Sequence, residues 1–333
     1  MTIELQADWR TILRQNFTNF GELAAFLELS DEVVASIDAQ PEFRLQLPRR
    51  LAEKIAKNCP TDPLFLQFVP LKKEHIVHPD FVQDPVGDAT FALEDKLLQK
   101  YQERALILAT SACAMHCRFC FRKNFDYEIE DKTFAKELRR IEEDSTLEEI
   151  ILSGGDPLSL SDEVLGRLIV NLANIPHIKR IRFHSRFIMG IPERVTESFL
   201  ELLGSCPKQI WFINHANHIN EFDDDIWQAL KAIQKLGIPV LNQTVLLHGV
   251  NDSKSALKAL LQGLVDHGIT PYYLHQLDEV QGSSHFKVAI SKGNALIQEL
   301  MKELPGFAIP KYVQEIAGEA SKTPLHTLDS SKT

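Results

Sequence analysis

Short apolar runs rich in β-branched residues alternate with amphipathic helical patterns along most of the chain. The runs predict strands at 104–110, 148–152, 180–184, 209–213, 238–247 and 271–275. One helical pattern between them places Leu257, Leu260, Leu261 and Leu264 on a single face and stops at Gly268. Because a strand–helix–strand connection between parallel strands is almost always right-handed, repeated units of this kind predict a parallel sheet.

Six strand–helix units are too few for a closed barrel, which has eight. We therefore predict an α/β fold built on a partial (βα)6 TIM-type barrel, with a flat doubly wound sheet as the alternative. Residues 1–100 read as a mainly helical N-terminal region, and residues 101–288 as the barrel. Residues 289–333 form a short C-terminal segment in this division.

A polar cluster lies at the end of each predicted strand, except that the cluster of the fifth strand lies within it. The clusters are the cysteines after the first run, then 153–156, 184–186, 214–220, Asn242 with Gln243, and 275–278. The carboxyl ends of parallel strands converge on one edge of the sheet, which is where active sites of such folds lie. The sequence therefore predicts one site assembled from all six units.

Three of the five cysteines lie within the eight residues CAMHCRFC: Cys113, Cys117 and Cys120. A closed structural zinc site uses four ligands, so this set is one ligand short. Closely spaced thiolates are also the ligands of iron–sulfur clusters. The spacing favours iron–sulfur, and the alternative is a zinc site completed by His116 or by a distant residue.

The pattern CxxxCxxC at the end of the first barrel strand resembles the radical S-adenosylmethionine (radical SAM) superfamily. That resemblance implies that the three cysteines bind three irons of a 4Fe–4S cluster, and that SAM binds the fourth iron. The stretch SGGDPL resembles the glycine-rich motif that lies near the methionine group of SAM. It implies SAM-binding roles for Ser153, Gly154, Gly155 and Asp156.

Longer stretches resemble lysine 2,3-aminomutases, and most closely the subgroup that makes β-lysine for modification of bacterial elongation factor P. They are RALILATSACAMHCRFCFRKNF, ILSGGDPL, NQTVLLHGVND, PYYLHQLDEVQGSSHF and GEASKTPL. The resemblance implies pyridoxal 5′-phosphate (PLP) as a further cofactor, bound as a Schiff base by Lys322. It also implies that Arg104 and Tyr101 lie beside a cofactor.

The same resemblance assigns residues to the substrate. Arg122 would bind the substrate carboxylate, and Asp278 and Glu315 would bind the ε-ammonium group of lysine. At the position of Glu315 the family has an aspartate, so this chain keeps the charge and adds one methylene. Gln243, His218 and Asn217 are implied to lie near SAM or the substrate.

We therefore expect a cytoplasmic isomerase, a radical SAM and PLP-dependent L-lysine 2,3-aminomutase. Its partners would be free L-lysine, a reducing protein such as flavodoxin or ferredoxin, and an elongation factor P ligase that uses the product. The formal charge of −10, from 36 basic and 46 acidic side chains, gives no basic face for nucleic acid. No apolar run approaches the ~18 residues typical of a membrane span, and the N-terminus lacks the apolar core of a secretory signal.

Two other functions stay open. One is an aminomutase acting on ornithine, arginine or glutamate, although paired carboxylates disfavour glutamate. The other is a zinc-stabilised, non-enzymatic binding module for a translation factor.

Overall fold

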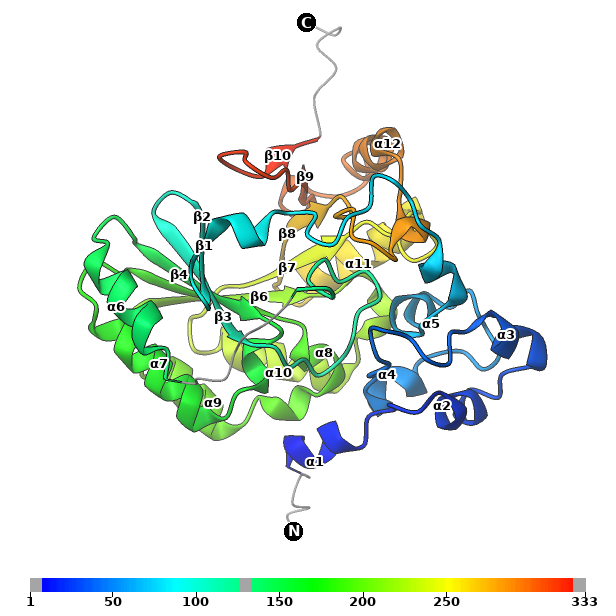
Figure 1. Cartoon of the computed structure of the whole chain (residues 1–333), viewed down its shortest axis with the longest axis horizontal. Coiled ribbons are helices and arrows are strands. Elements are labelled where there is room, and N and C mark those ends of the chain that lie inside the picture. The colour runs from blue at the N-terminus through cyan, green and yellow to red at the C-terminus, as the bar shows by residue number, and fades with distance from the viewer. Residues whose placement is uncertain (1–7, 126–132, 326–333) are drawn as a thin grey trace, which may run out of the picture.

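One sheet of ten strands runs through the computed structural model, which describes residues 8–125 and 133–325 (Figure 1). Six consecutive strands pair in parallel and match the six predicted runs. They are β3 (Arg104–Thr110), β4 (Glu149–Gly154), β5 (Arg180–Ser185), β6 (Gln209–His215), β7 (Val240–Val245) and β8 (Thr270–His275). The predicted parallel sheet is confirmed.

Four further strands extend the sheet at its two edges. β1 (Ala92–Glu94) and β2 (Leu97–Tyr101) pair in antiparallel fashion beside β3. β9 (Lys311–Gln314) is parallel to β8, and β10 (Thr323–Pro324) is antiparallel to β9. Since strand order follows the chain from β1 to β10, the described strands do not close into a ring, and the partial barrel is confirmed. The proposed boundary at residue 100 falls inside β2, and the domain division stays a prediction.

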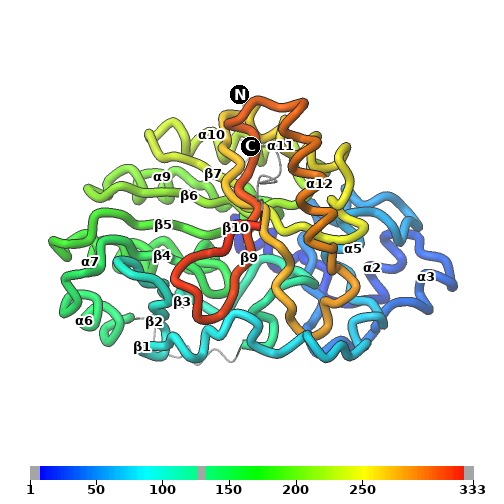
Figure 2. The backbone as a smooth tube through the Cα atoms, turned by 90° about the horizontal axis from the view of Figure 1, so that it is seen from above, coloured from blue at the N-terminus to red at the C-terminus, as the bar shows by residue number. Residues whose placement is uncertain are grey.

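Helices cover the outer side of the sheet (Figures 1 and 2). The longer ones are α6 (Ala135–Glu143), α7 (Asp162–Asn174), α9 (Glu197–Gly204), α10 (Asp224–Gln234), α11 (Lys254–Asp266) and α12 (Ile290–Leu300). The side chain of Ser253 caps α11, and Gly268 adopts a φ of +71° just beyond it, as the stop signal predicted. No helix of the described residues combines the length and the apolar character needed to cross a membrane.

The N-terminal region consists of short helices packed beside the barrel (Figure 1). They are α1 (Trp9–Arg14), α2 (Phe20–Phe26), α3 (Asp31–Ser36), α4 (Arg49–Glu53), α5 (Pro63–Phe68) and the 3₁₀ turns Lys72–His75 and Asp88–Phe91. Arg50 of α4 pairs with Glu193 at 2.6 Å and with Asp223 at 3.0 Å, both on the barrel. This region reaches the carboxyl ends of the strands, where it contributes side chains to the site.

Short helical turns follow several strand ends and complete the barrel. They are α8 (Phe187–Gly190) and the 3₁₀ turns Pro157–Ser159, Pro192–Arg194, Ile219–Glu221, Ser284–Phe286 and Gly306–Ala308. All except Gly306–Ala308, which leads from α12 to β9, lie between the carboxyl end of a strand and the next long helix.

Alternation along each strand separates the core from the interior of the barrel. In β5, Ile181 and Phe183 are fully buried under the helices. The residues that alternate with them, Arg182 and His184, line a cavity inside the barrel. The same period places polar side chains on the inner face of other strands.

Replacing Phe212 by alanine should lower the free energy of unfolding by about 3–5 kcal/mol. The ring of Phe212 in β6 is fully buried and stacks on Phe183 with 6.2 Å between centroids. Phe307→Ala is the matched control because Phe307 is 70% exposed, so its effect should stay within about 0.5 kcal/mol. Denaturant titration followed by circular dichroism measures both, and equal effects would contradict this description of the core.

Candidate active site

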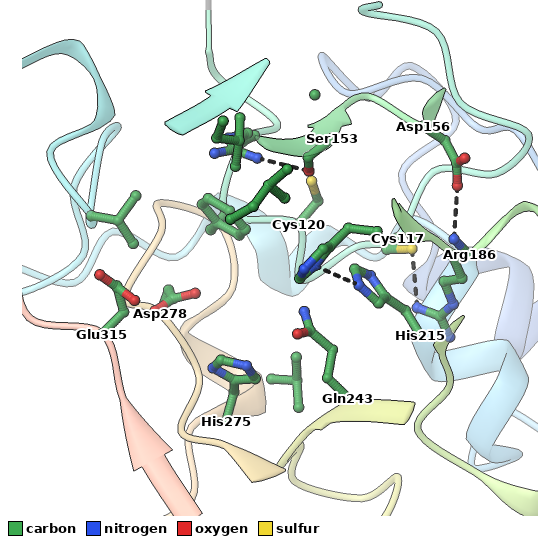
Figure 3. A pocket seen from close by; sticks show the side chains of 18 of the residues that line it. Cys117, Cys120, Ser153, Asp156, Arg186, His215, Gln243, His275, Asp278 and Glu315 are labelled. Atoms are coloured by element: carbon green, nitrogen blue, oxygen red, sulfur yellow. Dashed lines mark hydrogen bonds between the residues drawn. The ribbon is translucent and has the colours of Figure 1, made fainter. Parts of the chain in front are cut away.

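A cavity of about 420 Å³ lies at the carboxyl ends of the parallel strands. Its wall contains nearly all the residues predicted from the sequence: Tyr101, Arg104, Cys113, Cys117, Cys120, Arg122, Ser153, Gly154, Gly155, Asp156, Asn217, Gln243, Asp278, Glu315 and Lys322. In Figure 3, Cys117 and Arg186 lie on one side of this cavity, and Asp278 and Glu315 lie on the other. The sequence prediction of a single shared site therefore agrees with the arrangement of the chain.

The three cysteines follow β3 on one loop and form the first end of the cavity. All three are free thiols, and burial raises the pKa of Cys120 to about 11. His116 is turned away, since its ring stacks on Phe43 and its Nδ1 lies 2.9 Å from the Arg44 carbonyl oxygen. Within residues 8–125 and 133–325, no three His, Cys, Asp or Glu side chains are arranged to hold a single metal ion. The zinc site completed by His116 is therefore not formed.

The two glycines of SGGDPL allow the end of β4 to press against the cysteine loop. Gly154 has a φ of +111°, and a Cβ on Gly155 would lie 2.4 Å from the Ala112 carbonyl oxygen. The N–H of Gly155 donates to the Thr110 carbonyl at 2.6 Å, and that of Asp156 donates to the Ala112 carbonyl at 2.8 Å. The glycines are needed for this close approach of backbones as well as for access to the cavity.

The carboxylate of Asp156 is fully engaged by protein groups. It accepts hydrogen bonds from the N–H groups of Leu158, Arg186 and Phe187 and from the Ser185 hydroxyl. Burial raises the pKa of Asp156 to about 6 despite these donors. Asp156 thus ties the end of β4 to the end of β5, although the sequence predicted a cofactor contact.

Lys322 lies at the second end of the cavity, in the C-terminal segment that includes β10. Its Nζ pairs with Glu315, which also accepts from Lys100 at 2.6 Å and from the Tyr101 hydroxyl at 2.6 Å. Burial alone would raise the pKa of Glu315, but the Lys322 charge and these hydrogen bonds lower it to about 2. Glu315 is therefore ionised and neutralised by two lysines.

Asp278 differs from Glu315 although the two carboxylates lie close together (Figure 3). Within the described part of the chain its carboxylate makes no hydrogen bond or ion pair. Burial raises the pKa of Asp278 to about 7, against the opposing charge of Lys322. Asp278 therefore holds its proton more readily than Glu315 does.

Arg122 projects into the cavity from just beyond the cysteines. Its Nε donates to Asp88 at 2.7 Å, and its Nη1 lies 3.4 Å from the Ser153 hydroxyl. Asp88, from the 3₁₀ turn of the N-terminal region, therefore fixes the plane of the guanidinium group.

His218 is the predicted site residue that does not reach the cavity wall. Its Nδ1 accepts the N–H of Asn220 and so caps the 3₁₀ turn Ile219–Glu221. Its neighbours His215 and Asn217 line the cavity instead. The cofactor role of His218 has no support in this geometry because its side chain serves the turn.

The chain is similar to known proteins over nearly its whole length. The model of the radical SAM superfamily matches residues 107–260. The L-lysine 2,3-aminomutase of Escherichia coli (strain K12) is 39% identical, over 96% of this chain and 94% of that protein. That of Haemophilus influenzae is 38% identical over 96% of each, and that of Clostridium subterminale is 31% identical over 96% and 77%. The chain belongs to the lysine 2,3-aminomutase family.

Family membership confirms the predicted cofactors, because lysine 2,3-aminomutases use a 4Fe–4S cluster, SAM and PLP. The donor set fits these groups. Three thiols that converge on one cavity suit a cluster with one iron open to another ligand, as in a catalytic metal site. At the other end, Lys322 carries an amine of the kind that PLP enzymes require, and Arg104 and Tyr101 line the same cavity.

Several residues of the lysine 2,3-aminomutase site were missed by the sequence prediction. They are Lys100, Asp88, Arg182, Tyr272 and Tyr273. Arg186 and the inward-facing histidines His184, His215 and His275 lie in the predicted polar clusters, but the sequence assigned no individual role to them. Burial lowers the pKa of each of these histidines, and that of His215 falls to about 3, so they are neutral. The period-two alternation that identified the strands could have found Arg182 and Tyr273, because each lies two residues before an inward-facing histidine of the same strand.

Gly155→Ala should reduce the iron bound per chain after anaerobic reconstitution. The new methyl group would meet the Ala112 carbonyl, and overpacking of this kind costs roughly 1–3 kcal/mol or more. The cysteine loop must move to accept it. Gly306→Ala is the matched control, since nothing lies within 4 Å of its Cβ position. Iron and sulfide analysis at the native level in Gly155→Ala would refute the close-approach role.

Proposed function

We propose that this protein is a radical SAM, PLP-dependent L-lysine 2,3-aminomutase that converts L-α-lysine to β-lysine. The supporting observation is that one cavity holds the three cysteines at one end and Lys322 with Asp278 at the other. Cys113, Cys117 and Cys120 would hold the cluster, which with SAM would supply a radical able to remove hydrogen from an unactivated carbon, and Lys322 would hold PLP, which would bind the amino group that migrates. The family match over nearly the whole chain supports the same reaction.

The chain's own residues would bind and orient the substrate between these ends. Arg122, held by Asp88, presents a planar guanidinium suited to a carboxylate. The neutral histidines His184, His215 and His275 and the side chain of Gln243 form the wall between the two ends.

Selection of a cationic side chain follows from the charges around Asp278. Lys100 neutralises Glu315 even when Lys322 holds PLP, so the next cation to enter is best placed beside Asp278. A glutamate substrate would bring a third carboxylate next to Asp278 and Glu315, and neighbouring like charges are unfavourable. Ornithine and arginine are cationic competitors, and their different lengths place the charge away from the optimal position for lysine.

We also propose that β-lysine is used by an elongation factor P ligase, and that a flavodoxin or ferredoxin delivers the electron. The first proposal rests on the motif resemblance of the sequence to the elongation factor P subgroup. The second rests on the need of radical SAM enzymes for a reductant.

Chiral chromatography after anaerobic incubation with lysine, SAM, PLP and a reductant should detect β-lysine. Lys322→Ala should abolish turnover and the retention of PLP through gel filtration, because it removes the amine at the second end of the cavity. Lys311→Ala is the matched control, since Lys311 lies exposed on neighbouring β9. Parallel incubations with ornithine, arginine and glutamate should give less product.

Absence of β-lysine, with a product from another amino acid, would overturn the substrate assignment. Retention of PLP and full turnover in Lys322→Ala would overturn the cofactor assignment. Bound zinc with no iron would overturn the whole proposal in favour of a binding module.

The KM for lysine should rise as pH falls below about 7, by roughly tenfold per unit. Asp278 has its pKa raised to about 7, so acid protonates it and removes the charge that attracts the substrate ammonium. Lys322, Glu315, Lys100 and Asp88 surround it, and Glu315 stays ionised throughout. Steady-state kinetics between pH 6 and 9 provide the measurement.

Asp278→Asn should raise KM at pH 8 at least roughly tenfold, because losing one partner of a buried charge pair costs about 2–5 kcal/mol. It should also flatten the pH dependence of KM. Glu279→Gln is the control, since Glu279 pairs with Lys287 outside the cavity wall. A native profile in Asp278→Asn would show that another group binds the ammonium.

A further inference from the structure

Arg186 forms a buried contact with one of the three cysteines (Figure 3). It follows β5 directly, and its Nη1 donates to the Sγ of Cys117 at 3.0 Å. Its Nη2 donates to Glu221 at 2.8 Å and to Gln67 at 2.7 Å. A single guanidinium group thus joins the cysteine loop, the turn after β6 and helix α5.

Both Nη atoms and both neighbouring aromatic rings restrain the guanidinium of Arg186. It stacks between the rings of Phe68 and Phe119, at 4.9 and 5.3 Å from their centroids. Its own backbone N–H donates to the Asp156 carboxylate at 2.7 Å. Arg186 is 7% exposed, so solvent screens its charge little.

The counter-ion Glu221 is equally fixed and is fully buried. Its Oε1 accepts from the N–H groups of Asn217 and His218 and from the Gln67 amide, while Oε2 faces Arg186. Breaking such a network leaves an uncompensated buried charge, so both ions keep their positions. The sulfur of Cys117 therefore has a fixed donor and a cation beside it, and the carboxylates of Glu221 and Asp156 act on it from farther away.

We propose that Arg186 is a positioning residue that sets the reduction potential of the iron–sulfur cluster through Cys117, with Glu221 acting in the opposite direction. The proposal rests on the proposed function only in that the cysteines carry the cluster. Hydrogen bonds to ligand sulfurs and net charge nearby are the levers by which a protein tunes such a cluster. A donor and a positive charge favour the reduced cluster, which is one charge more negative.

This role also explains the aspartate in SGGDPL. Asp156 accepts hydrogen bonds from the backbone of Arg186 and Phe187, and Arg186 donates to Cys117. The motif is thus connected to the cysteine loop through its aspartate as well as through its glycines. The glycines contact the loop by backbone, and the aspartate supports it through an arginine. Two parts of one motif thus act on the same loop by different routes.

The test compares three variants of the full chain, reconstituted anaerobically with iron, sulfide and PLP. Arg186→Gln removes the charge and Glu221→Gln removes the opposing charge. Arg194→Gln is the matched control, because Arg194 is fully buried and pairs with Asp162 without contacting a cysteine. Redox titration followed by electron paramagnetic resonance of the reduced cluster measures the potential without any assay of turnover.

We expect Arg186→Gln to lower the ratio of reduced to oxidised cluster at fixed potential by about tenfold, which is 59 mV for one electron. Glu221→Gln should raise the ratio, and Arg194→Gln should leave it unchanged. Opposite shifts are not expected from general damage to the fold.

Equal potentials in Arg186→Gln and Arg194→Gln, or shifts of the same sign in Arg186→Gln and Glu221→Gln, would overturn the proposal. If Arg186→Gln binds no cluster, Glu221→Gln decides alone: a higher potential supports the proposal and any other result overturns it. A native chain without iron would instead refute the proposed function, so the two failures are distinguishable.

Discussion

The backbone contact between the cysteine loop and the end of β4 organises the first half of the site. Gly155 and Asp156 donate N–H groups to the carbonyls of Thr110 and Ala112, which leaves no room for a Cβ at the glycines. Once β4 is fixed against the loop, the Asp156 carboxylate is placed to bind the start of the turn after β5. From there Arg186 reaches back to Cys117. A short chain of hydrogen bonds thus links three consecutive structural units to one sulfur.

Two neighbouring carboxylates at the other end have opposite ionisation tendencies, and the difference lies in their partners. Glu315 has Lys100, Lys322 and the Tyr101 hydroxyl, so its pKa falls to about 2. Asp278 has burial without a partner in the described chain, so its pKa rises to about 7. Environments that separate two pKa values in this way assign different roles to chemically similar groups. Glu315 organises the pocket, and Asp278 is available to a substrate.

The sequence predicted the barrel well because its signals are local. Each strand is an apolar run with polar residues at its carboxyl end, and parallel pairing then brings those ends together. Partners from the N-terminal region could not be predicted in this way. Asp88 and Gln67 lie in short helical turns without a period, and only tertiary packing brings them to Arg122 and Arg186. His218 was predicted to lie near a cofactor, but neighbouring side chains in the loop after β6 have different positions. Asn217 lines the cavity, whereas His218 caps a 3₁₀ turn.

The barrel is open between its first and last strands, and side chains join these two edges. β2 and β9 lie on opposite sides of the six barrel strands, and no described backbone hydrogen bonds join them. Side chains close the gap instead, since Lys100 and Tyr101 from β2 both bind Glu315, which directly follows β9. Glu315 is therefore committed to joining the two edges of the sheet.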